Sequence, residues 1–149
     1  MRRVASLNLW ASLMTKLFET EEDRERERIA VFRFAAFTNS VPYKMPLESQ
    51  ADYIMMRGPD AKAIVEIKCR TNRSDQYDEY MVGEKKYKAL CKWADYGFHP
   101  FLLISWPDAI GYVKVPVEHK KSMQGRNDRG PQIVPDPVVL IDMKKFKMI

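Results

Sequence analysis

The chain has 149 residues, 46% of them hydrophobic, which is enough for one hydrophobic core but short for two, so a single domain over residues 1–149 is expected. The net charge of +5 is compatible with a polyanionic partner such as nucleic acid but does not identify one. No apolar segment is long enough to span a membrane, no signal-peptide cleavage site is evident, and the two cysteines lack zinc or disulfide spacing. We therefore expect a cytoplasmic protein with no membrane partner.

The first predicted element is a helix over residues 20–38. Thr20 followed by Asp23 resembles a capping box, and a charged run leads without a breaker into an apolar stretch. Pro42 and Pro46 then carry the chain toward the first strand. Residues 1–19 are predicted to form either a short N-terminal helix or an arm.

Two apolar runs follow, ADYIMM at residues 51–56 and AIVEIKCR at residues 63–70, and both are predicted strands. The turn Arg57-Gly58-Pro59-Asp60 would join them as a hairpin. Because successive side chains of a strand alternate between faces, Glu66 and Lys68 point the same way. Asp52 can then approach Glu66, and such a like-charge pair destabilises a sheet unless a cation lies between the carboxylates.

A second predicted helix spans residues 79–96, where apolar residues recur at helical spacing until Gly97. Two more strands are predicted, over residues 100–106 and 110–115. The order helix, strand, strand, helix, strand, strand indicates an α/β fold with a central mixed sheet flanked by helices.

The C-terminal part contributes two further predicted segments. Residues 119–131 are basic, contain glycine and lack apolar periodicity, which predicts a surface loop. Residues 138–142 form a short apolar run after two prolines, which predicts an edge strand.

Asp52, Glu66 and Lys68 are the candidate chemical groups. Oxygen ligands favour a hard divalent ion such as Mg²⁺, and a neighbouring lysine suits contact with a phosphate or an attacking water, which indicates metal-assisted phosphodiester cleavage. A glutamate and a lysine two residues apart more often belong to a solvated strand face. The apolar residues 63–65 favour a central strand instead, where charged groups need partners.

This pattern resembles the PD-(D/E)XK nuclease superfamily, which includes restriction endonucleases, phage exonucleases and Holliday junction resolvases. The resemblance rests on Asp52 ahead of Glu66-Ile67-Lys68, a glutamate on the preceding helix and a polar residue on the following one, and it covers roughly residues 20–115. Ala51 stands where the superfamily name has proline. The resemblance implies a restriction endonuclease-like core and a Mg²⁺-dependent deoxyribonuclease in which Mn²⁺ can substitute.

The resemblance also implies residue roles. Asp52, Glu66 and the backbone carbonyl of Ile67 would bind the metal, and Lys68 would lie next to the attacking water. A glutamate of the first helix would support the metal directly or through water.

The candidates for that glutamate are Glu22, Glu25 and Glu27. Glu27 is preferred because Val31 and Phe34 place it at the end of a core-facing stripe, and Glu25 is second. A salt-bridged helix surface is the alternative interpretation of these glutamates.

On the second helix, resemblance to resolvases suggests that Lys85 or Lys86 reaches the scissile phosphate or orients the carboxylates. Lys86 is preferred because Leu90, four residues on, keeps it near the apolar face. The candidate phosphate contacts are Arg70, Lys85, Lys120, Lys121, Arg126 and Arg129.

The expected function is thus endonucleolytic cleavage of duplex or branched DNA, structure-selective or weakly sequence-specific, with a homodimer as one way to cut both strands. The compact size resembles phage or mobile-element enzymes, which would act in the host cytoplasm. The alternative is a nucleic-acid-binding or assembly protein that keeps the fold without hydrolysis. The sequence also leaves RNA open as the substrate, because nothing in it reports on the sugar hydroxyl.

Overall fold

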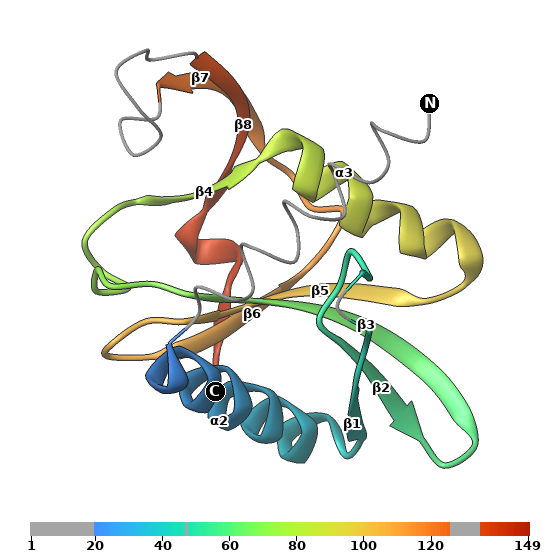
Figure 1. The fold of residues 1–149 in the computed structure, drawn as a ribbon. Helices are drawn as coiled ribbons and strands as arrows, with labels where there is room; N and C mark the ends of the chain where they lie inside the picture. The colour runs from blue at the N-terminus through green and yellow to red at the C-terminus, as the bar shows by residue number, and fades with distance from the viewer. Residues whose placement is uncertain (1–19, 47, 126–134) are drawn as a thin grey trace.

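The structure of the protein is a computed structural model, which describes residues 20–46, 48–125 and 135–149. Its central element is a six-stranded mixed sheet, with helix α2 on one face and helix α3 and a second, three-stranded sheet on the other (Figure 1). The predicted mixed α/β sheet flanked by helices is therefore confirmed. The prediction for residues 1–19 lies outside the described residues.

Helix α2, Glu21–Thr38, forms where it was predicted. The hydroxyl of Thr20 accepts a hydrogen bond from the backbone N–H of Asp23 at 3.1 Å, which caps the first turn. Asn39 ends the helix in the left-handed conformation, at φ 51°.

The large sheet has the spatial order β1-β2-β3-β5-β6-β9. Its strands are β1 Val41–Lys44, β2 Tyr53–Arg57, β3 Asp60–Cys69, β5 His99–Ser105, β6 Ile110–Lys114 and β9 Lys147–Met148. Only β3 and β5 pair in parallel, and the other neighbours are antiparallel. The predicted hairpin is confirmed, since Arg57 pairs with Asp60 across Gly58, whose φ of 61° suits glycine.

The crossover between β3 and β5 differs from the predicted single helix over residues 79–96. It consists of strand β4 Glu79–Gly83, helix α3 Glu84–Cys91 and the 3₁₀ helix η1 Lys92–Tyr96. The prediction is wrong for the first segment, where Tyr80 and Val82 are buried in alternation with more exposed neighbours, as expected of a strand.

The second sheet has the order β4-β8-β7, with β7 at Lys120–Gly125 and β8 at Pro135–Asp142. The predicted loop over residues 119–131 is wrong for β7, whose residues 120, 121, 123 and 124 are exposed and which is held by antiparallel pairing with β8 rather than by apolar burial. Residues 126–134 lie outside the described residues. The predicted edge strand over residues 138–142 is wrong in its position, because β8 is the central strand of this sheet.

Two apolar clusters cover the two faces of the large sheet. Val65 and Ile67 of β3 belong to the cluster under α2, whereas Ile64 belongs to the cluster between the large sheet, α3 and the second sheet. By strand alternation Glu66 and Lys68 lie on the same face as Ile64. No helix among the described residues is long and apolar enough to cross a membrane.

Candidate active site

Glu66 is the buried charged group at the centre of the candidate site. It lies on β3 between β2 and β5, and only 2% of the residue is exposed. Lys68 Nζ lies 3.3 Å and Lys86 Nζ 3.1 Å from the same carboxylate oxygen, Oε1. The other oxygen, Oε2, is buried without a hydrogen-bond partner among the described residues. A buried carboxylate oxygen without a partner is energetically costly. A bound cation or a hydrogen-bond donor at Oε2 would remove this cost.

The pKa of Glu66 also indicates that the negative charge of this carboxylate is only partly compensated. Burial, and to a smaller extent the negative charge of Asp52, raise the pKa of Glu66, whereas Lys68 and Lys86 lower it, and the balance leaves this pKa at about 7. The two lysines therefore offset burial and the Asp52 charge only in part. A cation next to Glu66 would favour its ionised form.

Asp52 lies just before β2 and extends the pairing of β2 with β3. Its backbone N–H donates to the carbonyl of Val65 at 3.0 Å, and its Oδ2 accepts the backbone N–H of Ile67 at 2.8 Å. In a strand the N–H and C=O of one residue point to the same side, so the Ile67 carbonyl faces the side on which the Asp52 carboxylate lies. Oxygen atoms of Asp52, Glu66 and Ile67 thus lie around the same stretch of β3.

Glu27 is positioned differently. It is 8% exposed on α2, the helix that covers the face of the sheet opposite Glu66, and its Oε1 lies 3.3 Å from Lys44 Nζ. Among the residues that the structure describes, no three His, Cys, Asp or Glu side chains lie close enough to hold a metal ion. The structure therefore brings Lys68 and Lys86 to Glu66 and places Asp52 close enough to act on the charge of that carboxylate, whereas the contact it gives for Glu27 is with Lys44.

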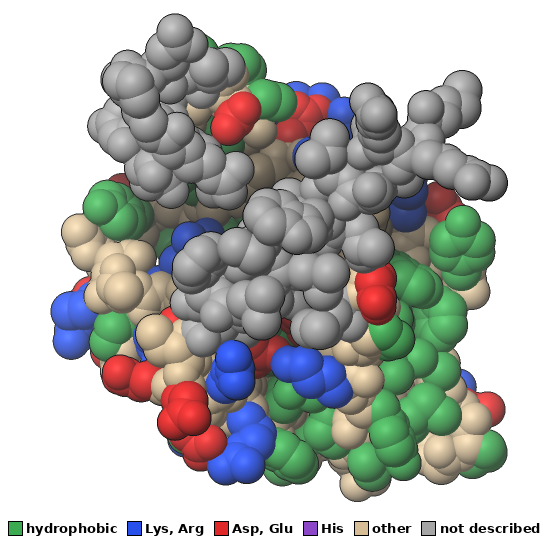
Figure 2. All heavy atoms as spheres, in the orientation of Figure 1, with side chains coloured by type: hydrophobic (Ala, Val, Ile, Leu, Met, Phe, Trp, Pro, Cys, Tyr) green, Lys and Arg blue, Asp and Glu red, His purple; other side chains and the backbone are tan. Residues whose placement is uncertain are grey.

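The other glutamates of α2 lie on the protein surface. Glu25 forms a 2.8 Å ion pair with Arg28, and both side chains are exposed. Figure 2 shows acidic and basic side chains next to each other on the lower part of this view, where α2 lies in Figure 1. Glu22 is exposed as well. The salt-bridged surface interpretation therefore describes Glu25, whereas Glu27 is buried.

Lys44 and Tyr53 were not among the residues singled out from the sequence. Lys44 Nζ lies 5.4 Å from the centre of the Tyr53 ring, in addition to its ion pair with Glu27. Partial burial lowers the pKa of Lys44, but the charge of Glu27 and smaller contributions, among them that of Asp52, leave it raised. Lys44 is thus an electrostatic link between α2 and the site. Strand β1 was not predicted because Pro42 interrupts its short apolar pattern, so Lys44 could not be identified from the sequence.

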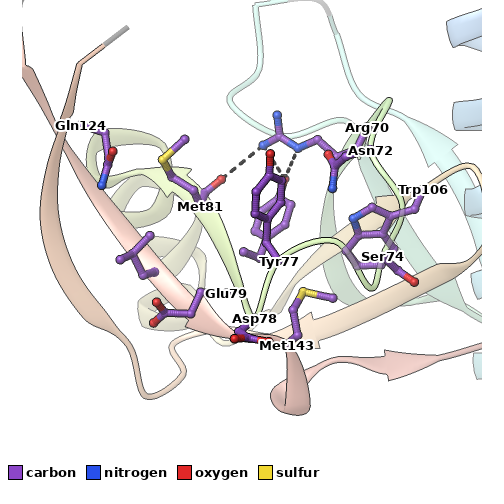
Figure 3. A pocket seen from close by; sticks show the side chains of 12 residues that line it. Arg70, Asn72, Ser74, Tyr77, Asp78, Glu79, Met81, Trp106, Gln124 and Met143 are labelled. Atoms are coloured by element: carbon purple, nitrogen blue, oxygen red, sulfur yellow. Dashed lines mark hydrogen bonds between the residues drawn. The ribbon is translucent and has the colours of Figure 1, made fainter.

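Arg70 directly follows the end of β3, and its backbone N–H donates to the carbonyl of Ser105 at 2.8 Å. Its Nε and Nη2 donate to the hydroxyl of Tyr80 at 3.0 and 2.7 Å, and Nη2 also donates to the carbonyl of Met81 at 3.3 Å. Burial raises the pKa of Tyr80 to about 12, so the hydroxyl is neutral near pH 7. Figure 3 shows the third nitrogen, Nη1, pointing away from these two acceptors.

The remaining basic candidates are spread over the second sheet and α3. Lys85 is exposed on α3. Lys120 lies 3.7 Å from Glu79 and Lys121 lies 3.8 Å from Glu84, in both cases with an exposed lysine side chain. The other two predicted phosphate contacts, Arg126 and Arg129, lie outside the described residues.

A mixed sheet with a buried glutamate on a central strand, a lysine two residues on and an aspartate on the neighbouring strand is the arrangement that the PD-(D/E)XK signature predicts, which places the protein in the class of such nucleases. The comparison of sequences identifies the family within this class. Over residues 14–149 the sequence matches the family described as "Phage putative PDDEXK endonuclease", and the chain belongs to this family. No curated protein and no solved structure matches the chain.

Proposed function

We propose that the chain hydrolyses DNA phosphodiester bonds as a Mg²⁺-dependent endonuclease whose metal ligands are Asp52, Glu66 and the carbonyl of Ile67. The observation that carries this proposal is the buried Oε2 of Glu66, which has no hydrogen-bond partner among the described residues. A bound cation would supply that partner. It would also relieve the repulsion between Asp52 and Glu66.

The chemistry of the donor set fits this metal. Two carboxylates and a backbone carbonyl are hard oxygen ligands, and Mg²⁺ in proteins is bound by one or two carboxylates while it keeps several waters. Mn²⁺ accepts the same ligands and should substitute. When bound, the metal would lower the pKa of a coordinated water and neutralise charge on the scissile phosphate.

Two lysines complete the proposed machinery. The side chain of Lys68 is 40% exposed while its ammonium lies 3.3 Å from Glu66, so it can meet a water or phosphate that approaches from solvent. In that position the ammonium would orient the attacking water, or, as the neutral amine, Lys68 would accept the proton of that water and become the ammonium. Lys86 would hold Oε1 of Glu66 in place and stabilise negative charge on the phosphate.

Glu27 has a supporting role in this proposal. Its ion pair with Lys44 on the α2 side of the sheet supports an action on the site through Lys44, or through water held near the metal, rather than as a direct ligand. Removal of Glu27 should then weaken cleavage less than removal of Glu66.

The DNA backbone is proposed to follow the basic side chains around this face. Arg70 is next along β3, and Lys85, Lys120 and Lys121 extend the basic surface over α3 and the second sheet. Arg126 and Arg129 are kept as proposed contacts from the sequence. Phosphate contacts make DNA binding salt-dependent and carry little sequence information, which fits structure-selective or weakly sequence-specific cleavage. The cleaving species is either a monomer or a homodimer.

The test is cleavage of supercoiled plasmid and of branched DNA in Mg²⁺, with the EDTA reaction as the blank. Glu66→Ala and Lys68→Ala should each lower the rate by about 10²–10⁴-fold. Lys62→Ala is the matched control, because Lys62 is an exposed lysine of the same strand paired with Asp60. DNA binding without cleavage in any divalent metal would favour the non-hydrolytic alternative, and a parallel RNA substrate decides between the two nucleic acids.

A further inference from the structure

A cavity of about 610 Å³ opens beyond the end of β3, between the large sheet and the second sheet (Figure 3). Its volume is within the range of about 300–1,000 Å³ that is usual for small-molecule sites. Its lining includes Arg70, Asn72, Tyr77, Tyr80, Trp106 and Gln124. We call this cavity the β3–β4 pocket, because the connection between these two strands forms much of its wall.

The β3–β4 pocket lies next to the candidate active site. Arg70, on its wall, is two residues beyond Lys68 and directly follows the end of β3, and two residues of extended chain span about 7 Å. Tyr80, also on the wall, accepts hydrogen bonds from Arg70 and is close enough to Glu66 for that charge to contribute to its raised pKa. The pocket is therefore within reach of a nucleotide that neighbours a phosphate bound at Glu66 and Lys68.

The wall combines aromatic rings with side-chain amides. Tyr77 is 60% exposed, whereas Trp106 and Tyr80 are buried and contact each other edge to face with ring centres 6.2 Å apart. Asn72 and Gln124 each bring an amide with both a donor and an acceptor. Stacking on aromatic rings together with hydrogen bonds to the base edge is how proteins hold unpaired or extruded nucleobases.

The pocket is also electrically asymmetric. Figure 3 shows Arg70 at one end and the carboxylates of Asp78 and Glu79 at the other. A phosphate is attracted to the guanidinium end and repelled from the carboxylate end, where Lys120, 3.7 Å from Glu79, offsets part of the negative charge. Carboxylates accept hydrogen bonds from exocyclic amino groups such as that of cytosine. The charges thus favour a nucleotide whose phosphate lies at Arg70 and whose amino group points to Asp78 and Glu79.

We propose that the β3–β4 pocket binds one unpaired or extruded nucleobase of the DNA substrate, with the adjoining phosphate at Arg70, and that it prefers bases with an exocyclic amino group over thymine. The proposal rests on the function proposed above, because it assigns the substrate contact that selects distorted DNA. It predicts preferential binding of branched or mismatched DNA, where a base is already unpaired.

The first test is an NMR titration of the whole protein with dCMP, with dTMP and with inorganic phosphate. We expect dCMP to shift the indole N–H signal of Trp106 and the amide signals of Asn72 and Gln124, dTMP to shift them less at equal concentration, and phosphate alone to leave these three unchanged. Equal shifts with phosphate alone, or dCMP shifts confined to other residues, would overturn the base pocket.

Variants provide the second readout. Tyr77→Ala should lower the affinity for dCMP by about 10-fold, because one base–aromatic stack is lost. The ratio of the affinities for mismatched and matched duplex should fall by about the same factor. Tyr43→Ala is the matched control, because Tyr43 on β1 is 57% exposed, close to the exposure of Tyr77. An equal effect of the two variants would contradict the proposal.

Plasmid cleavage in Mg²⁺ separates failure of this inference from failure of the nuclease assignment. Cleavage by a protein whose pocket gives no nucleotide signal would refute the base pocket and leave the nuclease function standing. Nucleotide signals in the pocket of a protein that cuts no nucleic acid would support the base pocket and refute hydrolysis.

Discussion

Lys86 Nζ lies 3.1 Å from Oε1 of Glu66, although Lys86 comes from α3 and Glu66 from the middle of β3. This contact joins the two layers of the fold at the point where the sheet carries its buried carboxylate. Lys68 reaches the same oxygen from the strand itself. Two ammonium groups thus share one carboxylate oxygen, and the other oxygen is buried without a partner among the described residues.

Lys86→Met should destabilise the protein at pH 8 in EDTA by about 1–3 kcal/mol, because one partner of a buried carboxylate is removed. It should also slow plasmid cleavage by about 10–100-fold, the usual cost of losing a group that orients a metal ligand. Urea denaturation and initial rates measure the two effects. Lys62→Met, a change in an exposed lysine of β3 that is paired with Asp60, should have neither effect, and equal behaviour of the two variants would rule out the special role of Lys86.

Stability without metal should depend on pH through Glu66. Its pKa is about 7 in the folded protein against 4.5 in the reference state, so the folded protein binds the proton more tightly. This contribution to the free energy of unfolding is fully present below about pH 4.5 and is lost as the pH rises through about 7, by about 3 kcal/mol in total. Urea denaturation of the wild type and of Glu66→Gln in EDTA checks this, since the variant should lack this component.

Divalent metal should stabilise the folded protein through the same carboxylates. Mg²⁺ at ten times its dissociation constant should raise the free energy of unfolding by about 1.4 kcal/mol at pH 8, because it binds the folded state. Asp52→Asn and Glu66→Gln should lose most of this gain, whereas Lys62→Ala should keep it. Urea midpoints with and without Mg²⁺ measure the effect, and undiminished stabilisation of both carboxylate variants would place the bound metal elsewhere.

The backbone at the end of η1 offers a test of the corrected crossover. Gly97 has a φ of 87°, which L-residues rarely adopt, so Gly97→Ala should destabilise the protein by about 1 kcal/mol. Gly83→Ala is the matched control, since Gly83 has a φ of −59° and a Cβ there would meet no atom within 4 Å. Thermal denaturation should show a lower midpoint for the first variant only.

Much of the large sheet was predictable from local signals. The turn at Gly58-Pro59 and the apolar runs on either side of it define the β2–β3 hairpin, and the cap at Thr20 marks the start of α2. Strand alternation alone places Glu66 and Lys68 on one face. These features depend on neighbours in sequence, so the sequence carries them directly.

The second sheet was not predictable in the same way. Strand β7 is exposed and is held by backbone hydrogen bonds to β8, so it has no apolar pattern to detect. Strand β4 is short and is followed directly by α3. The alternating burial of Tyr80 and Val82 is therefore too brief to distinguish from the helical pattern that follows it.

The location of Glu27 relative to Asp52 and Glu66 could not be predicted from the sequence either. Its burial follows from the apolar stripe of α2, but the face of the sheet that α2 covers depends on the topology of the whole fold. The partner Lys44 lies on β1, a strand interrupted by Pro42. Long-range pairing of this kind leaves no local pattern.

The most direct test of the central claim is anomalous scattering from a crystal of the protein soaked in Mn²⁺. We expect a peak about 2 Å from carboxylate oxygens of Asp52 and Glu66 and from the carbonyl oxygen of Ile67. A fully occupied Mn²⁺ peak bound to other residues, with none beside Glu66, would contradict it.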